Sequence, residues 1–169
     1  MEILSQKSRE ALTRQLRIDE GNVLHVYQCS KNRTTIGNGR NLQDKGLSKQ
    51  ECDFLKLGTY DKNAVIAKLE VRGITQSECD YLLSNDIDEF SAELYNRIIW
   101  FKKLPKTAQN VLINMCLNLG FNRLSGFKKT LALIEKGSYK LASIEMLNSN
   151  WAIQVGDRAK RLSKILASC

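Results

Sequence analysis

The sequence predicts a mostly helical α+β protein, with a short strand-containing segment near the N-terminus and helices over most of the remainder. Apolar residues recur at three- and four-residue spacing over long stretches, as they do on the buried faces of helices. Two short runs between residues 24 and 37 have the composition of strands instead. The only proline is Pro105, so few positions interrupt a helical chain.

The first helix is expected to run from Ser8 to about Asp19. Ser8 is a typical N-cap residue, and Leu12 and Leu16 fall on one helix face. Gly21 is a typical residue at which a helix stops. The first helix would therefore end just before the strands.

Two short strands are expected next, over residues 24–28 (LHVYQ) and 33–37 (RTTIG). Both runs contain β-branched or aromatic residues, and the polar residues Ser30–Asn32 between them favour a turn. Three glycines between positions 37 and 46 favour a loop in the segment that follows.

Two capping-box patterns, Ser48 with Glu51 and Thr75 with Glu78, predict that helices begin at these positions. The second pattern opens the strongest helical periodicity in the sequence. Its apolar positions are Cys79, Leu82, Leu83, Ile87, Phe90, Leu94 and Ile98. They predict one long helix over about residues 75–100, which would connect two lobes.

Apolar periodicity continues beyond Pro105 and predicts a helical C-terminal part. The segments are residues 111–120, 127–137, 139–147 and 156–166. We therefore expect residues 1–169 to form a single domain with two lobes. The strand-containing lobe is expected over about residues 21–74, and the helical lobe over about residues 1–20 and 75–169.

The formal net charge of +8 indicates attraction to a polyanion, either nucleic acid, anionic lipid or the anionic bacterial envelope. No nucleic-acid-binding motif is recognisable. No apolar run approaches the ~20 residues of a membrane span, and MEILSQKSREALTRQ at the N-terminus lacks the apolar core of a secretory signal. We therefore expect a protein that is made in the cytoplasm without a signal peptide.

The chain contains five cysteines, at positions 29, 52, 79, 116 and 169. No CxxC pair or Cys/His cluster is present, so free thiols are expected rather than a structural zinc site. No metal or other cofactor is predicted.

The residues that could carry chemistry lie in one segment, residues 16–37, with the sequence LRIDEGNVLHVYQCSKNRTTIG. Hydrolysis of a glycosidic bond needs a carboxylic acid, and a second group that activates water or captures the sugar carbon. Glu20 could point from the helix end into a cleft, although a glutamate at such a position is usually solvated. Cys29 and Thr35 follow as chemically capable partners.

This segment resembles the catalytic region of the T-even phage lysozymes, glycoside hydrolase family 24. LRIDEG at residues 16–21 is followed by TIGNG at residues 35–39, as in that family. Further similarity follows in one register, with length changes confined near residues 44–70. It comprises GIT at 73–75, LINM at 112–115, LG at 119–120, SGF at 125–127, Trp151 and DRAKR at 157–161. The resemblance implies a lysozyme-like fold.

The resemblance also implies roles for three residues. Glu20 would be the general acid, and Thr35 falls on the threonine of the catalytic triad. Cys29 falls where the phage enzyme has its catalytic aspartate, and members with cysteine at this position belong to the family. A thiolate can act as a base toward water or attack carbon directly, so the stereochemistry of cleavage stays open. The alternatives are a buried structural thiol and an ordinary strand threonine.

Arg158 matches the arginine that, in this family, reaches across the cleft to pair with the catalytic glutamate; the alternative is a basic helix face. The substrate-binding positions of the family fall on Asn41, Leu117, Thr130 and Glu145. Only Thr130 is close in type to its counterpart, which is a serine. The departures at the other three positions leave the fine specificity open.

Arg40 stands where the phage enzyme has a histidine that pairs with an aspartate of the long helix, and that aspartate is kept as Asp86. We therefore expect an Arg40–Asp86 ion pair. The only histidine, His25, is expected to be exposed on the first strand and to have no catalytic role.

The implied function is that of an endolysin-like muramidase, a monomer that hydrolyses the β-1,4 bond between N-acetylmuramic acid and N-acetylglucosamine in peptidoglycan. The protein would reach the wall through a holin, a secretion apparatus or lysis. One alternative is a catalytically weak lysozyme-fold module that binds peptidoglycan or acts as a scaffold. A basic helical nucleic-acid binder is a third reading, which no motif supports.

Overall fold

The computed structural model describes residues 3–169, and this part of the chain divides into two compact units. One unit is Thr13–Asp86, and the other combines the chain up to Leu12 with Ile87–Cys169. The boundaries fall inside two helices, α1 (Gln6–Glu20) and α4 (Gln76–Arg97), so each of these helices contributes to both units. The expected α+β class is confirmed, since one unit contains a small sheet and the other is helical.

The sheet of the first unit is antiparallel, with the order β1 (Val23–Gln28), β2 (Thr34–Gly37) and β3 (Arg40–Asn41). The two expected strands are confirmed. They are joined by a tight turn, in which the amide of Asn32 donates to the carbonyl of Cys29 at 2.8 Å. The third strand was expected to be loop, because two residues are too few to show a strand period.

Two helices follow the sheet in the same unit, α2 (Lys49–Phe54) and α3 (Lys62–Arg72). The capping box of α2 is confirmed, because the Ser48 hydroxyl accepts from the Glu51 amide and the Glu51 carboxylate accepts from the Ser48 amide. Helix α3 was not predicted. Its local signal is Asp61, whose carboxylate accepts from the amide of Ala64 at 3.0 Å.

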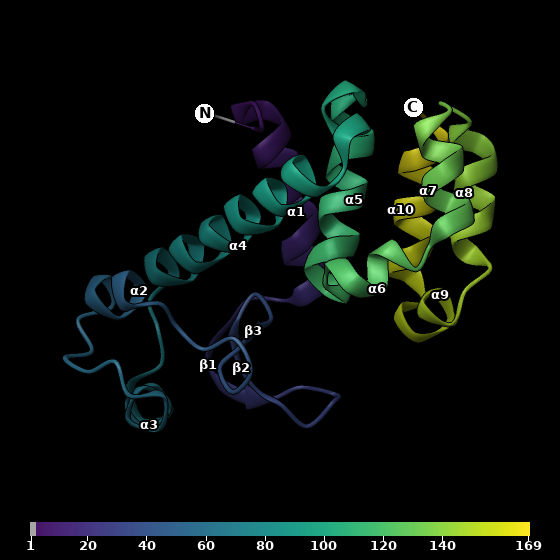
Figure 1. The fold of residues 1–169 in the computed structure, drawn as a ribbon. Helices are drawn as coiled ribbons and strands as arrows, with labels where there is room; N and C mark the ends of the chain where they lie inside the picture. The colour runs from purple at the N-terminus through teal and green to yellow at the C-terminus, as the bar shows by residue number, and fades with distance from the viewer. Residues whose placement is uncertain (1–2) are drawn as a thin grey trace. The chain divides into compact units, whose positions relative to one another are not determined.

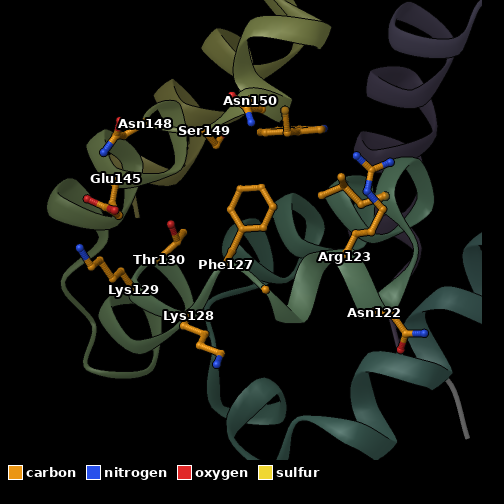
Figure 2. Close-up of a pocket in the computed structure, with 13 residues that line it drawn as sticks. Asn122, Arg123, Phe127, Lys128, Lys129, Thr130, Glu145, Asn148, Ser149 and Asn150 are labelled. Atoms are coloured by element: carbon orange, nitrogen blue, oxygen red, sulfur yellow. The ribbon is translucent and has the colours of Figure 1, made fainter.

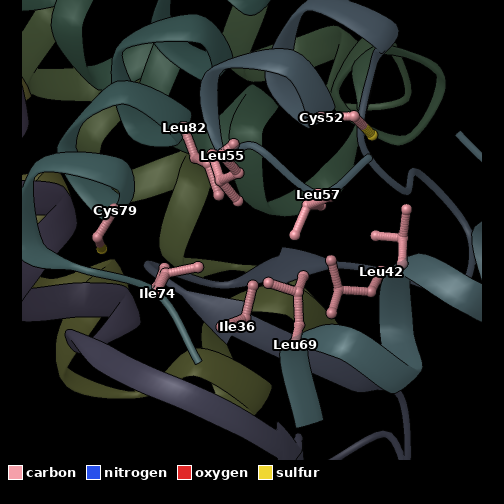
Figure 3. Packing of buried hydrophobic residues seen from close by; sticks show 10 residues of the cluster. Ile36, Leu42, Cys52, Leu55, Leu57, Leu69, Ile74, Cys79 and Leu82 are labelled. Atoms are coloured by element: carbon pink, nitrogen blue, oxygen red, sulfur yellow. The ribbon is translucent and has the colours of Figure 1, made fainter. Parts of the chain in front are cut away.

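A hydrophobic cluster holds β2, α2, α3 and the first part of α4 together, as Figure 3 shows. The buried members are Ile36, Leu42, Cys52, Leu55, Leu57, Val65, Leu69, Ile74, Cys79 and Leu82. Their burial removes apolar surface from water and fixes the hairpin against the helices that follow it.

The expected start of α1 is wrong. The helix begins at Gln6, and its cap is Ser5, whose hydroxyl accepts from the amide of Ser8 at 3.3 Å. Ser8 lies inside the helix and is buried, and its hydroxyl donates to the side-chain oxygen of Asn110 at 2.9 Å. The expected end of the helix is confirmed, since the Gly21 amide donates to the carbonyl of Arg17.

Besides the first part of α1 and the last part of α4, the second unit contains the helices that follow α4. They are the 3₁₀ helix η1 (Ile99–Lys103), α5 (Lys106–Leu119), α6 (Phe121–Ser125), α7 (Lys128–Glu135), α8 (Tyr139–Leu147), α9 (Asn150–Val155) and α10 (Asp157–Ala167). Helices α7, α8 and α10 lie side by side (Figure 1), and α10 also packs against α5. The four expected helical segments are confirmed, whereas α6 and α9 are too short to show periodicity.

Helix α4 begins with the expected capping box of Thr75 and Glu78. It ends at Arg97 because Ile98 adopts extended backbone angles, with φ −114° and ψ 101°. In the described part of the chain, no helix combines the length and apolarity that crossing a bilayer requires.

The expected Arg40–Asp86 ion pair is confirmed and belongs to a larger buried cluster. Arg40 Nη2 lies 2.8 Å from Asp86 Oδ1, and the same guanidinium makes two bonds of 2.9 and 3.0 Å to the carboxylate of Glu51. It also donates to the carbonyls of Gly46 and Leu82. A charge removed from water is tolerated only when it is paired in this way.

The carboxylate of Glu51 is held in its ionised form. Desolvation by burial would by itself raise its pKa, but hydrogen bonds and charge from Arg40, with further hydrogen bonds from Asn85 and the Ser48 amide, lower it from 4.5 to about 2. The ionised carboxylate therefore serves both the helix cap and the buried guanidinium.

The free energy of unfolding should depend on pH through the ionisation of the Glu51 carboxylate. Since its pKa is depressed in the folded state, Glu51 stabilises the fold above pH 4.5, and this contribution is lost as the pH falls toward about 2. We expect Glu51→Gln to be less stable than wild type at neutral pH and to lose less stability between pH 4.5 and about 2. Urea denaturation followed by circular dichroism over this pH range measures the difference.

The matched control is Glu70→Gln, on the exposed side of α3, which should follow the wild-type curve. A wild-type pH dependence in Glu51→Gln would show that ionisation of Glu51 is not coupled to folding.

Candidate active site

Glu20 is the last residue of α1, and the backbone of Gly39 lies against its carboxylate. A Cβ atom added to Gly39 would lie 2.7 Å from Glu20 Oε2, so the carboxylate would have to move, and 3.2 Å from Glu20 Cδ, which is a tight contact. Gly39 also has φ +82°, a conformation that disfavours other residues. Both observations require glycine at this position if the Glu20 carboxylate is to stay where it is.

Asn38 ties the end of α1 to this loop. Its side chain is buried and donates to the carbonyl of Gly21, directly after Glu20. The thiol of Cys79 lies 3.2 Å from the Asn38 side-chain oxygen and 3.3 Å from that of Asn22. The loop therefore holds the helix end through a side chain that is itself fixed.

Cys29 follows the last residue of β1 and is half-buried. Desolvation raises the pKa of this thiol, but backbone hydrogen bonds from Arg33 and Lys31 and a side-chain hydrogen bond from Thr35 together outweigh that effect. The pKa of Cys29 therefore lies below the ordinary value of 9.0. The turn between β1 and β2 thus stabilises a thiolate at this position.

The other thiols are chemically different from Cys29. Burial raises the pKa of Cys116 to about 12, and it also raises the pKa values of Cys52, Cys79 and Cys169. Cys29 is therefore the one thiol of residues 3–169 whose pKa lies below its ordinary value and which is suited to act as an anion.

Thr35 lies on β2 and is buried, with 3% of its surface exposed. Its hydroxyl is hydrogen-bonded to the carbonyl of Arg33 at 2.8 Å and to Cys29. A hydroxyl has one proton to donate and two lone pairs that accept. When Cys29 is protonated, Thr35 can donate to Arg33 and accept from the thiol; when Cys29 is ionised, the same proton can turn to the sulfur.

Tyr27 belongs to the same group of side chains, which sequence reasoning missed. It lies opposite Thr35 in the sheet, and burial raises its pKa, as do the negative charges of Glu20 and Cys29. The sequence could have indicated Tyr27, because it stands two residues before Cys29 and alternate residues of a strand point to the same face. Thr35 is therefore hydrogen-bonded to Cys29, and Glu20 and Cys29 both lie near enough to Tyr27 for their charges to act on it.

The helical unit contains a pocket of about 630 Å³ that includes two of the expected substrate-binding residues, Thr130 and Glu145. Figure 2 shows the ring of Phe127 between Thr130 and Arg123. The indole of Trp151 meets that ring edge-on, with 5.9 Å between the centroids. The aromatic pair and the polar rim could receive a sugar or a peptide, and sequence reasoning had not assigned either aromatic residue to a site.

The remaining expected substrate-binding residues lie elsewhere. Asn41 is on β3, and its side chain bonds Asp44 and the backbone amides of the same turn. Leu117 is on α5 and is half-buried, outside the residues described as lining the pocket of Thr130 and Glu145. Their expected roles stay predictions.

Arg158 lies on α10 and is buried, unlike the exposed Lys160 and Lys164 of the same helix. Its Nε and Nη2 atoms donate to the side-chain oxygen of Asn114 on α5, at 3.0 and 2.8 Å. The guanidinium is thus fixed inside the helical unit rather than solvated. Its expected pairing with Glu20 stays a prediction.

A family model described as phage lysozyme matches residues 17–165, a range that includes all these candidate residues. The chain belongs to the phage lysozyme family. Two relatives from Dictyostelium discoideum are similar along almost their whole length. "Probable T4-type lysozyme 2" is 28% identical over 153 residues, 89% of each chain. "Probable T4-type lysozyme 1" is 28% identical over 157 residues, covering 89% of this chain and 90% of the relative.

Membership of the phage lysozyme family confirms the expected lysozyme-like fold and makes the protein a glycoside hydrolase. The family implies peptidoglycan as the substrate in general terms. In this lysozyme, the middle member of the expected triad is the thiol of Cys29 rather than a carboxylate. Its ionisation can therefore be measured with a thiol reagent, apart from that of the carboxylates.

The thiol of Cys29 should ionise more readily than an ordinary cysteine, because its pKa is lowered. We expect its alkylation by iodoacetamide to rise with pH to a midpoint below 9.0. Thr35→Val should raise that midpoint, because it removes a hydrogen bond to the thiolate. Thr34→Val is the matched control, because the Thr34 hydroxyl bonds Gln28 instead. The measurement uses a chain in which the other four cysteines are serine or alanine.

A Thr35→Val midpoint equal to those of the wild type and of Thr34→Val would show that the hydroxyl does not stabilise the thiolate.

Proposed function

We propose that this lysozyme is a muramidase that hydrolyses the β-1,4 bond between N-acetylmuramic acid and N-acetylglucosamine in bacterial peptidoglycan. The observation that carries the proposal is the thiol of Cys29. It is the one thiol of residues 3–169 whose pKa is lowered, it is hydrogen-bonded to Thr35, and its charge, like that of Glu20, acts on Tyr27. A glycosidase needs one acid and one base or nucleophile at the scissile bond, and these residues supply both.

Glu20 is proposed as the general acid. Its proton passes to the leaving oxygen as the bond between that oxygen and the sugar carbon breaks. Gly39 leaves room for this carboxylate, and Asn38 holds the backbone of Gly21 directly after it. Glu20 thereby acts from a helix end that its surroundings fix.

Cys29 is proposed as the base, with Thr35 positioning the water. A water that donates one proton to the thiolate can attack the sugar carbon, after which the thiol holds the proton that the water has lost. Since Thr35 is hydrogen-bonded to Cys29, its hydroxyl can hold that same water. In the alternative route the sulfur itself bonds to the carbon, and water then cleaves the intermediate.

We also propose supporting roles for residues of the helical unit. Arg158 is fixed and charged, which suits a group that stabilises negative charge during the reaction. Thr130 and Glu145 line a pocket of suitable size for part of the substrate, with the rings of Phe127 and Trp151 as apolar walls. Asn41 and Leu117 are proposed as further substrate contacts.

More specifically, we propose that the enzyme acts as an endolysin, and membership of the phage lysozyme family supports this role. In that role the enzyme reaches the wall through a holin, a secretion apparatus or lysis. The positive charge of the chain favours approach to an anionic envelope.

Mass spectrometry of the products from purified peptidoglycan tests the proposed function. Reducing N-acetylmuramic acid ends support a muramidase. Anhydro-muramic ends would mean a lytic transglycosylase, and intact glycan strands that retain bound protein would mean a peptidoglycan-binding module.

Replacement of the acid should abolish most turnover. Glu20→Gln keeps the shape of the side chain and removes the transferable proton, so we expect the rate to fall by at least ~10²-fold. Release of reducing ends from peptidoglycan measures the rate, and the melting temperature should not fall. The neighbouring variant Asp19→Asn is the control and should stay active. Near wild-type turnover in Glu20→Gln would remove Glu20 from the mechanism.

Replacements of Cys29 should separate a catalytic role from a structural one. Cys29→Asp should retain activity, because a carboxylate can accept a proton from the same backbone position. Cys29→Ala should lose most activity, because a methyl group cannot. Turnover and melting temperature are measured together for both. If Cys29 is structural instead, the order reverses, since a poorly solvated carboxylate is costly and alanine is tolerated.

A further inference from the structure

The positive charge of the chain is concentrated in its C-terminal part. Residues 94–169 contain thirteen Lys and Arg but only three Asp and Glu, so this part carries more than the whole formal charge of +8. No acidic residue occurs between Glu93 and Glu135. The seven basic residues of this stretch are Arg97, Lys102, Lys103, Lys106, Arg123, Lys128 and Lys129. Such a field attracts anionic surfaces over about a Debye length.

An exposed apolar residue lies within this acid-free stretch, on η1, the segment with the sequence IWFKK. Ile99 is 88% exposed, and Trp100 beside it is half-buried. Phe101 is fully buried and anchors the segment, while Lys102 and Lys103 are exposed. The segment therefore presents an aliphatic and an aromatic side chain next to two cations.

A groove of about 430 Å³ adjoins Ile99 and extends the apolar surface. Its apolar lining consists of Ile98, Ile99, Trp100, Phe121, Leu131 and Ala132. Arg97 lies over the ring of Phe121, with its guanidinium carbon 3.8 Å from the ring centroid. The acidic residues nearby are Glu135, in the groove lining, and Glu93, which pairs with Arg97 at 2.9 Å.

We propose that η1 and this groove dock onto the surface of an anionic lipid bilayer. Ile99 would enter the boundary between headgroups and acyl chains, Trp100 would lie at the headgroup level, and the flanking lysines would meet lipid phosphates. A wall polymer or a nucleic acid would use the lysines but has no apolar phase to receive Ile99. The exposed isoleucine therefore favours lipid over other polyanions.

The proposal rests on Ile99 and the groove, which contain none of the residues given a role in the proposed reaction; Lys128 lines both the groove and the pocket of Thr130 and Glu145. Docking would hold the enzyme at the membrane face, where an anionic bilayer adjoins the cell wall. Attachment would be peripheral, since no helix of the described chain is suited to span a bilayer.

Cosedimentation with lipid vesicles tests the proposal. The full chain is mixed with vesicles of phosphatidylcholine alone or of phosphatidylcholine with phosphatidylglycerol. We expect binding to the anionic vesicles only, weakening with salt. Ile99→Ser should bind about ten-fold more weakly, because it removes the apolar group that enters the bilayer. Ile153→Ser is the matched control, since Ile153 is 81% exposed on α9 and is not among the residues that line the groove.

Both variants should keep the wild-type melting temperature and peptidoglycan turnover, which shows that the fold is intact. Equal binding of wild type and Ile99→Ser to anionic vesicles would overturn the proposal, because charge alone would then explain the attraction. Binding to neutral vesicles at the same affinity, or no binding to either kind, would overturn it as well.

Discussion

The strand-containing unit depends on the buried ion pairs that the guanidinium of Arg40 makes with Glu51 and Asp86. The guanidinium bonds Glu51 of α2 and Asp86 of α4, and Lys45 reaches the same aspartate at 2.5 Å, so two cations offset two carboxylates. Arg40 begins β3, directly after Gly39. The ion cluster therefore anchors β3 at the residue that directly follows Gly39, whose backbone lies against the Glu20 carboxylate.

Much of this unit could be predicted, because its signals are local or belong to a family pattern. The capping boxes at Ser48 and Thr75 need only four residues each, and the Arg40–Asp86 pair followed from a family resemblance. The bond of Glu51 to Arg40 could not be predicted. A capping-box pattern reports hydrogen bonds within one helix turn, whereas the guanidinium of Arg40 comes from a strand outside the helix. Ser8 was misassigned because its partner, Asn110, is remote in sequence.

The candidate site shows the same division between local and three-dimensional information. Glu20, Cys29 and Thr35 were named from spacing and resemblance. The structure contains a hydrogen bond between Thr35 and Cys29 and has Glu20 and Cys29 near Tyr27, while the catalytic roles stay predictions. The lowered pKa of Cys29 could not be predicted, because it arises from backbone bonds that exist only once the turn has formed. Tyr27 was missed, since a tyrosine in a strand is ordinary until its neighbours carry charge.

The contact between Gly39 and Glu20 means that these two positions cannot vary independently. Any side chain at Gly39 would occupy space that the Glu20 carboxylate now fills, and it would also need a backbone conformation that it disfavours. A shorter acid at position 20 would relieve the collision but would withdraw the carboxylate from its present place. A substitution at residue 39 therefore also displaces the carboxylate of residue 20, so the two positions have to be changed together.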